Sequence, residues 1–256
     1  MDFSQPQVMG ILNITPDSFS DGARFSEPAS ATAQLKKLIA DGADIIDIGG
    51  ESTGPGSPDV SVDEELKRVK PVIDYIHTQK LTDQVIFSID TYKSRVAEYA
   101  LAHGFAMVND VTALRGDPNI LKLLATRQPY VILMCSKDPT PRTTKKSVEY
   151  GDVIAAIKTF LSERIAMLIK AGFPKDKIII DPGMGAFVSA DPKYSYEIID
   201  RLGELKTLGY PICVGPSRKS FLGGDISARD AKSWVIAKKA LKNGASIIRM
   251  HQIKLS

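Results

Sequence analysis

The sequence has little of several features that would mark special classes of protein. It contains only two cysteines among 256 residues, so neither a disulfide framework nor a Cys-x-x-Cys metal pair is available. No apolar run approaches the roughly 18 residues of a membrane span. The N-terminus lacks a basic region followed by an apolar run that ends in small residues, so we expect no signal peptide. These absences predict a cytoplasmic protein.

An excess of charge of either sign is also lacking. The chain has 33 Lys and Arg against 30 Asp and Glu, a net charge of +3, which allows an anionic substrate but gives no reason to expect nucleic acid or a membrane as partner. Hydrophobic residues make up 43% of the chain, enough to bury a large core. The length matches one (β/α)8 barrel of about 250 residues, so we treat residues 1–256 as a single domain.

Eight short apolar runs alternate with longer amphipathic stretches. Near-continuous apolar runs are typical of parallel strands that are covered on both faces. The runs span residues 8–14, 45–49, 85–90, 107–111, 130–134, 178–181, 211–215 and 246–251. The helix-like stretches span residues 31–40, 62–79, 93–103, 118–126, 152–171, 192–208 and 228–243. The alternation predicts an α/β fold, and the strand count favours a TIM barrel over a doubly wound sheet.

The end of the sequence departs from an ordinary barrel. Only five residues follow His251, too few for an eighth helix, which we expect to be missing or truncated. The outer flank of the last strand is then exposed, or another chain covers it, or the chain is cut short. An exposed apolar flank favours association, so we predict a homodimer.

Polar residues stand at the ends of seven of the eight predicted strands. In a barrel, the carboxyl ends of the strands and the loops after them carry the catalytic groups. Any one of these residues can be a simple turn former or helix cap, but a set that converges on one rim predicts a site. The set includes Asn13, Asp17, Thr53, Asp90, Asn109, Asp181, Ser217, Lys219, Arg249 and His251.

The chemistry of these residues suggests two kinds of ligand. Asp90, Asn109, Asp181 and Lys219 supply acceptors and donors that match a flat ring rich in nitrogen. The guanidinium of Arg249 can stack on such a ring.

An anion suits the remaining groups. Arg249 can fork onto phosphate oxygens, with Asn13, Ser217 and His251 beside it. Arg249 and His251 are two residues apart, so they point to the same side of a strand. Together the two groups predict a heterocycle that carries a phosphorylated leaving group.

Two long motifs resemble the signatures of dihydropteroate synthase. They are MGILNITPDSFSDG at residues 9–22 and GADIIDIGGEST at residues 42–53. Shorter landmarks of the family follow in order over essentially the whole chain: Ser88-Ile-Asp-Thr91, Asn109-Asp110, Asp181-Pro-Gly183, Ser217-Arg-Lys-Ser220 and Ile248-Arg-Met-His251.

The resemblance implies a (β/α)8 barrel that condenses 7,8-dihydropterin pyrophosphate with p-aminobenzoate in folate synthesis, uses Mg²⁺, and is the target of sulfonamides. By the same resemblance, the pterin contacts are Asp90, Asn109, Met134, Asp181, Lys219 and Arg249. Asn13 contacts Mg²⁺ and, with Arg249 and His251, the pyrophosphate. The p-aminobenzoate site is bordered by Phe19, Thr53, Pro55 and Ser220. The residues with catalytic roles are Asp17, Asp90, Asp181 and Lys219.

The sequence also departs from the family pattern. Gly54 stands where an arginine usually follows Glu-Ser-Thr, Cys135 replaces a histidine, and Gln252 replaces an aspartate. These differences keep a non-catalytic or weakly active pterin-binding paralogue open. A methyltetrahydrofolate-dependent methyltransferase barrel is a further alternative, but the Thr-Pro-Asp-Ser-Phe and Ser-Arg-Lys-Ser runs argue against it. We favour an active synthase.

Overall fold

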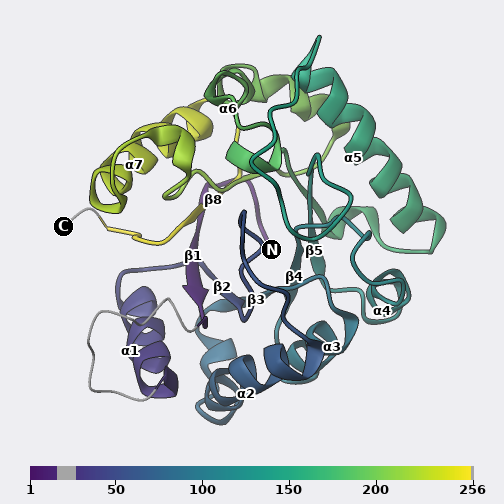
Figure 1. Ribbon diagram of the computed structural model, residues 1–256. Helices are drawn as coiled ribbons and strands as arrows, with labels where there is room; N and C mark the ends of the chain where they lie inside the picture. Colours follow the sequence, from purple (N-terminus) through teal and green to yellow (C-terminus); the bar gives the residue numbers. More distant parts are fainter. Residues whose placement is uncertain (16–26, 255–256) are drawn as a thin grey trace.

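Eight parallel strands form a barrel that a ring of helices surrounds (Figure 1). The computed structural model describes residues 1–15 and 27–254, so Asp17 and Phe19 lie outside the described residues. The strands are β1 Gln7–Asn13, β2 Ile45–Gly49, β3 Ile86–Asp90, β4 Met107–Asp110, β5 Tyr130–Met134, β6 Ile178–Asp181, β7 Cys213–Val214 and β8 Ile247–Met250. The helices are α1 Glu27–Ala40, α2 Val62–Thr78, α3 Ser94–Ala102, α4 Ile120–Arg127, α5 Val153–Lys170, α6 Pro192–Asp200 and α7 Ile226–Lys242.

The barrel closes weakly at one place. The strands pair in the order β6-β5-β4-β3-β2-β1-β8-β7, and a single bridge between Ile180 and Ile212 joins the two ends. The predicted strand over residues 211–215 is reduced to Cys213–Val214. Pro211 and Pro216 flank it, and a proline has no N–H to donate to a ladder. The predicted TIM barrel is confirmed.

Strand alternation separates a dry floor from a polar layer above it. Met9, Ile45, Met107 and Ile247 are fully buried and pack together inside the barrel, with Ile132, Ile179 and Cys213. Side chains two residues further along a strand point the same way. They lie closer to the carboxyl ends and are mostly polar: Asp47, Asn109, Met134, Asp181 and Arg249. The site therefore stands on a rigid apolar base.

Local signals set most helix bounds. The hydroxyl of Ser61 accepts from the backbone N–H of Glu64 at 3.1 Å, the predicted N-cap of α2. The stretch predicted as one helix over residues 192–208 is divided, because α6 ends at Asp200 and a 3-10 turn spans Leu202–Leu208. Gly203 lies at the break, and glycine is unfavourable inside a helix. Within the described chain, none of the helices is both long and apolar enough to cross a bilayer.

The last strand is covered without an eighth helix. Through residue 254 the chain forms no helix after β8, as predicted. However, the outward side chains of Ile248 and Met250 are 0% and 1% exposed, so the first of the three alternatives, an exposed flank, is wrong. Ile253 packs with Leu38 of α1 over Gly10, where an added Cβ would come within 3.0 to 3.1 Å of both. The short C-terminal segment thus takes over part of the covering role.

Candidate active site

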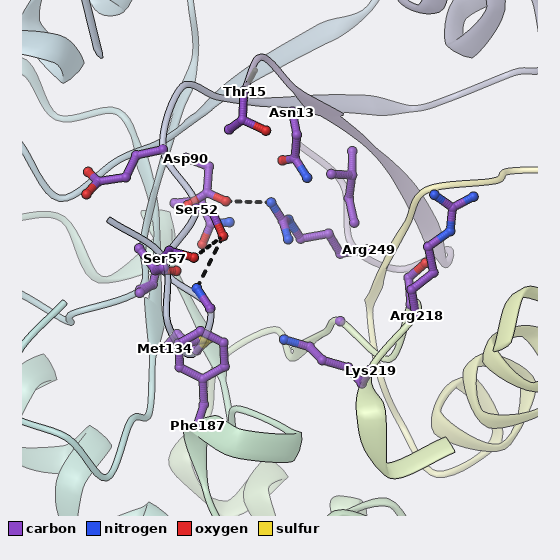
Figure 2. Close-up of a pocket in the computed structure, with 18 of the residues that line it drawn as sticks. Asn13, Thr15, Ser52, Ser57, Asp90, Met134, Phe187, Arg218, Lys219 and Arg249 are labelled. Carbon is purple, nitrogen blue, oxygen red and sulfur yellow. Dashed lines mark hydrogen bonds and ion pairs between the residues drawn. The ribbon is translucent and has the colours of Figure 1, made fainter. Parts of the chain in front are cut away.

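A cavity of about 840 Å³ opens at the carboxyl ends of the strands. Figure 2 shows side chains from several strands pointing into it. Eleven of the residues predicted from the sequence to form a site line it: Asn13, Thr53, Pro55, Asp90, Asn109, Met134, Asp181, Ser217, Lys219, Arg249 and His251. Ser220 is exposed and is not among the lining residues. The sequence thus located the cavity, and Ser220 lies beside it.

A buried ion network forms the strand-built side of the cavity. The Arg249 guanidinium donates through Nε to Asp47 Oδ2 and through Nη2 to Asp90 Oδ2, both at 2.6 Å, and Figure 2 marks the second bond. Asn109 Nδ2 donates to the same Asp47 oxygen at 2.8 Å. Asp47 is 0% exposed. One carboxylate therefore orients both Arg249 and Asn109.

Asp47 was not among the site residues chosen from the sequence, although a signal was present. Asp47 lies two residues after Ile45 in an otherwise apolar strand, so alternation places it inside the barrel. Asp110, in contrast, stands at the end of a strand but does not belong to the site. Its carboxylate accepts from the backbone of Thr112 and Leu114 at 2.8 and 2.7 Å, so it shapes the turn after β4, while its neighbour Asn109 faces the cavity.

Two of the carboxylates that line the cavity, Asp90 and Asp181, have raised pKa values. Burial raises the pKa of Asp90 to about 7, although the positive charge of Arg249 acts against this. Burial also raises the pKa of Asp181 to about 6, against the backbone N–H of Gly183, which donates to Asp181 at 2.7 Å. Gly183 has φ +71, and a Cβ there would lie 2.2 Å from the carbonyl oxygen of Cys135. Only glycine fits this turn.

Lys219 reaches the cavity from the loop after β7. Its ammonium lies 4.6 Å from the ring centroid of Phe187, a cation–π arrangement. Burial, together with the nearby charge of Arg249, lowers the pKa of Lys219 to about 8. The group is therefore mostly protonated at neutral pH and can donate hydrogen bonds. Phe187 carried no sequence signal, because it lies in the loop after β6.

The anion side of the cavity is formed by the last residue of β1 and by residues that follow β7 and β8. His251 Nδ1 lies 2.9 Å from Ser217 Oγ. Burial, with the nearby charge of Arg218, lowers the pKa of His251 to about 3, so the imidazole is neutral. Arg218 forms a two-point pair with Asp230 at 2.7 and 3.0 Å. The Asn13 amide lines the cavity and has no hydrogen-bond partner among the described residues, so its oxygen can contact a ligand.

These features define a barrel enzyme that binds a flat, nitrogen-rich ring beside an anion at the carboxyl end of its strands. The model of the family "Pterin binding enzyme" matches residues 9–251. The chain is 40% identical over 252 residues to a dihydropteroate synthase from a Synechocystis species, covering 96% of this chain and 85% of the relative.

Solved structures show the same likeness. A dihydropteroate synthase from Xanthomonas albilineans with 4-aminobenzoic acid matches with TM-score 0.90 and 38% identity, covering 99% of this chain and 90% of that one. The Yersinia pestis enzyme with a sulfonamide drug matches with TM-score 0.91 and 36% identity, covering 99% and 91%. The chain belongs to the pterin-binding enzyme family, within its dihydropteroate synthases, and the predicted resemblance is confirmed.

Proposed function

We propose that this chain condenses 7,8-dihydropterin pyrophosphate with p-aminobenzoate to give 7,8-dihydropteroate and pyrophosphate, a step of folate biosynthesis. The convergence of Asp90, Asn109, Asp181 and Lys219 on one cavity carries this proposal. These residues come from β3, β4, β6 and the loop after β7. The agreement with related synthases in sequence and fold supports it.

The strand-built side suits the pterin ring. The carboxylates of Asp90 and Asp181 accept from amino and ring N–H groups, whereas Asn109 and Lys219 donate to carbonyl and imine positions. Arg249 donates to a single oxygen of Asp90, Oδ2, and so leaves that carboxylate able to accept from the ring as well. Its Nε can stay on Asp47, so the guanidinium plane remains oriented for stacking.

The anion side suits the pyrophosphate. Arg249 carries a charge that Asp47 and Asp90 stabilise, which raises its pKa in spite of burial. Neutral His251 and Ser217 offer further polar contacts. Asn13 would hold Mg²⁺ through its amide oxygen, since Mg²⁺ commonly completes its coordination with substrate phosphates and water. When bound, Mg²⁺ neutralises charge on the leaving group.

The chain's own groups support the bond exchange by electrostatics. The C–O bond between the pterin methylene carbon and the pyrophosphate breaks, and its electron pair leaves with the pyrophosphate. A methylene cation conjugated with the pterin remains. Ionised Asp90 and Asp181 stabilise that cation. The amine nitrogen of p-aminobenzoate then forms the new C–N bond and loses one proton. The reaction requires no covalent enzyme intermediate.

A direct assay tests the proposal. Purified protein is incubated with the pterin pyrophosphate, p-aminobenzoate and Mg²⁺, and dihydropteroate and pyrophosphate are measured. We expect equimolar products. If micromolar protein forms no dihydropteroate, the chain is not a synthase.

Gly54 favours a second candidate, a pterin-binding paralogue with little or no turnover. The usual arginine at this position would add a cation to the anion side. Calorimetry with the pterin pyrophosphate distinguishes the two, because binding without product identifies the paralogue. Turnover that depends on a corrinoid would instead indicate the methyltransferase.

Location and assembly also remain proposals. We propose a cytoplasmic homodimer that sulfonamides inhibit by competing with p-aminobenzoate. Sedimentation at several protein concentrations tests the dimer, and a stable monomer at micromolar concentration would contradict it.

A further inference from the structure

An arginine from the loop after β5 crosses the cavity rim to the β2–α2 loop, which comprises residues 50–61. Arg142 Nε donates to the carbonyl oxygens of Ser57 and Pro58, both at 3.0 Å, and Nη2 donates to Pro58 at 2.7 Å. Nη2 also pairs with Glu51, and Nη1 pairs with Asp59. One guanidinium therefore contacts the loop near its start, at Glu51, and again in its second half, at residues 57–59.

The inner end of this clamp is fixed by a buried ion cluster. The Glu51 side chain is 3% exposed and accepts from Lys93 Nζ at 2.5 Å. Lys93 Nζ also pairs with Glu65 at 2.6 Å. Ion pairs at such sheltered carboxylates are stronger than those on the surface, because water and salt screen them less. Arg142 is thus tied to the rigid part of the barrel.

The loop that Arg142 holds is braced internally only between Ser52 and Ser57, where Ser57 donates to Ser52 Oγ at 2.8 Å and to the Gly54 carbonyl at 3.2 Å. It contains Gly54 and Gly56, the latter with φ +83, and glycine is the residue with most backbone freedom to lose. Residues 52–58 all line the cavity. The loop after β5 supplies one more bond to the β2–α2 loop, because the Thr143 N–H donates to the Thr53 carbonyl at 3.1 Å. The position of Thr53 and Pro55 therefore depends on the loop after β5.

We propose that Arg142 is a positioning residue for the amine substrate, acting through Thr53 and Pro55. The proposal rests on the proposed function, in which these two residues border p-aminobenzoate. Arg142 is not among the described residues that line the cavity, so it acts without touching substrate. Apart from an interaction with the side chain of Tyr92, its hydrogen bonds and ion pairs go to the β2–α2 loop, and within the described chain it bonds to neither Asp90 nor Asn109. The pterin site should be unaffected by its loss.

Steady-state kinetics with each substrate varied separately tests this assignment. In Arg142→Met we expect the KM for p-aminobenzoate to rise about tenfold, as for loss of a charged hydrogen bond, and the KM for pterin pyrophosphate to change less than about twofold. Arg142→Lys should be intermediate, because an ammonium keeps the charge but lacks the planar fork. Lys145→Met is the matched control, since Lys145 is an exposed cation of the same loop, and it should match the wild type.

The outcomes separate this proposal from the proposed function. If the wild type forms no dihydropteroate, the proposed function fails first, and this positioning role fails with it. If the wild type is active but both Arg142 variants keep the wild-type KM for the amine, only the positioning role fails. An equal rise in both KM values with a lower unfolding midpoint would show general destabilisation and also overturn it. Should Arg142→Met not fold, the amine KM of Arg142→Lys decides.

Discussion

The two sides of the cavity are built in different ways. The strand-built side rests on the barrel floor, and its Asp47, Asn109 and Asp181 are 0% to 7% exposed. The loop-built side consists of the β2–α2 loop, where Pro55 and Gly56 are exposed and long side chains from other loops hold the backbone. The barrel therefore preorganises recognition of the ring, whereas the position of the loop is held by a few replaceable contacts. Substitutions should have larger effects on the first side.

The largest effect is expected from Asp90→Asn on the strand-built side. The change keeps shape but removes a negative charge beside the developing cation, so kcat should fall about 100- to 1,000-fold, the usual scale for loss of one electrostatic contact. The unfolding midpoint should not fall, because Arg249 keeps Asp47 as a partner and the neutral amide avoids the cost of burying a carboxylate. Turnover and thermal unfolding are measured together. An unchanged kcat would show that Asp90 does not stabilise the cation.

Asp47→Asn tests whether a residue below the cavity matters as much as those that line it. Arg249 loses its charged anchor, so the Kd for the pterin pyrophosphate should rise roughly 10- to 100-fold, as expected from loss of a charged hydrogen bond. Ser88→Ala is the matched control, because Ser88 is the register partner of Asp47 and its buried hydroxyl has no partner within the described chain. Calorimetry measures both. Equal affinities in the two variants would make Asp47 a packing residue only.

The pH dependence should also reflect the strand-built side. Ionised Asp90, with a pKa of about 7, and protonated Lys219, with a pKa of about 8, are both required. Hence kcat/KM for the pterin substrate should fall about tenfold per pH unit below 7 and above 8. Replacing Asp90 with asparagine should move the acid limb of the residual activity down to about pH 6, where Asp181 titrates. A flat profile between pH 6 and 9 would contradict these roles.

The free energy of unfolding should also depend on ionisation of Asp90, but it should decrease over the pH range in which activity increases. The folded Asp90 carboxyl binds its proton more tightly than the unfolded one, whose pKa is near the ordinary 3.8. The free energy of unfolding therefore decreases as pH rises from about 4 to about 7. Denaturant unfolding of the wild type and Asp90→Asn at several pH values measures this contribution, which should be absent from the variant.

The difference between the strand-built side and the loop-built side also explains what could be predicted from the sequence. Near-continuous apolar runs predicted the strands, and the residues at their ends predicted the cavity, because both follow from local pattern and from closure of the barrel. The local pattern did not predict which residues bond to each other across the barrel. Arg249 and Asp47 are 202 residues apart, and Arg142 and Glu51 are 91 apart. Ser220 lies beside the cavity and not in its lining, because a residue in a loop has no alternation rule to set its direction.

The smallest effect is expected from Gly54→Arg on the loop-built side. A Cβ at Gly54 would meet only the hydroxyls of Ser52 and Ser57, at 3.5 and 3.8 Å, so the backbone can accept a side chain. The added cation would face the anion side, and we expect the KM for pterin pyrophosphate to fall a few-fold, less than the full effect of a charged hydrogen bond because the new side chain must also be ordered. Gly54→Gln supplies a side chain of similar reach without charge and should leave this KM unchanged. If both variants behave alike, the anion side already has the positive charge it needs, with Arg218 or Arg249 as its source. The loop-built side would then tolerate both changes at Gly54, whereas the strand-built side tolerates neither Asp90→Asn nor Asp47→Asn. This result would show that the loop-built side can change in evolution while the strand-built side cannot.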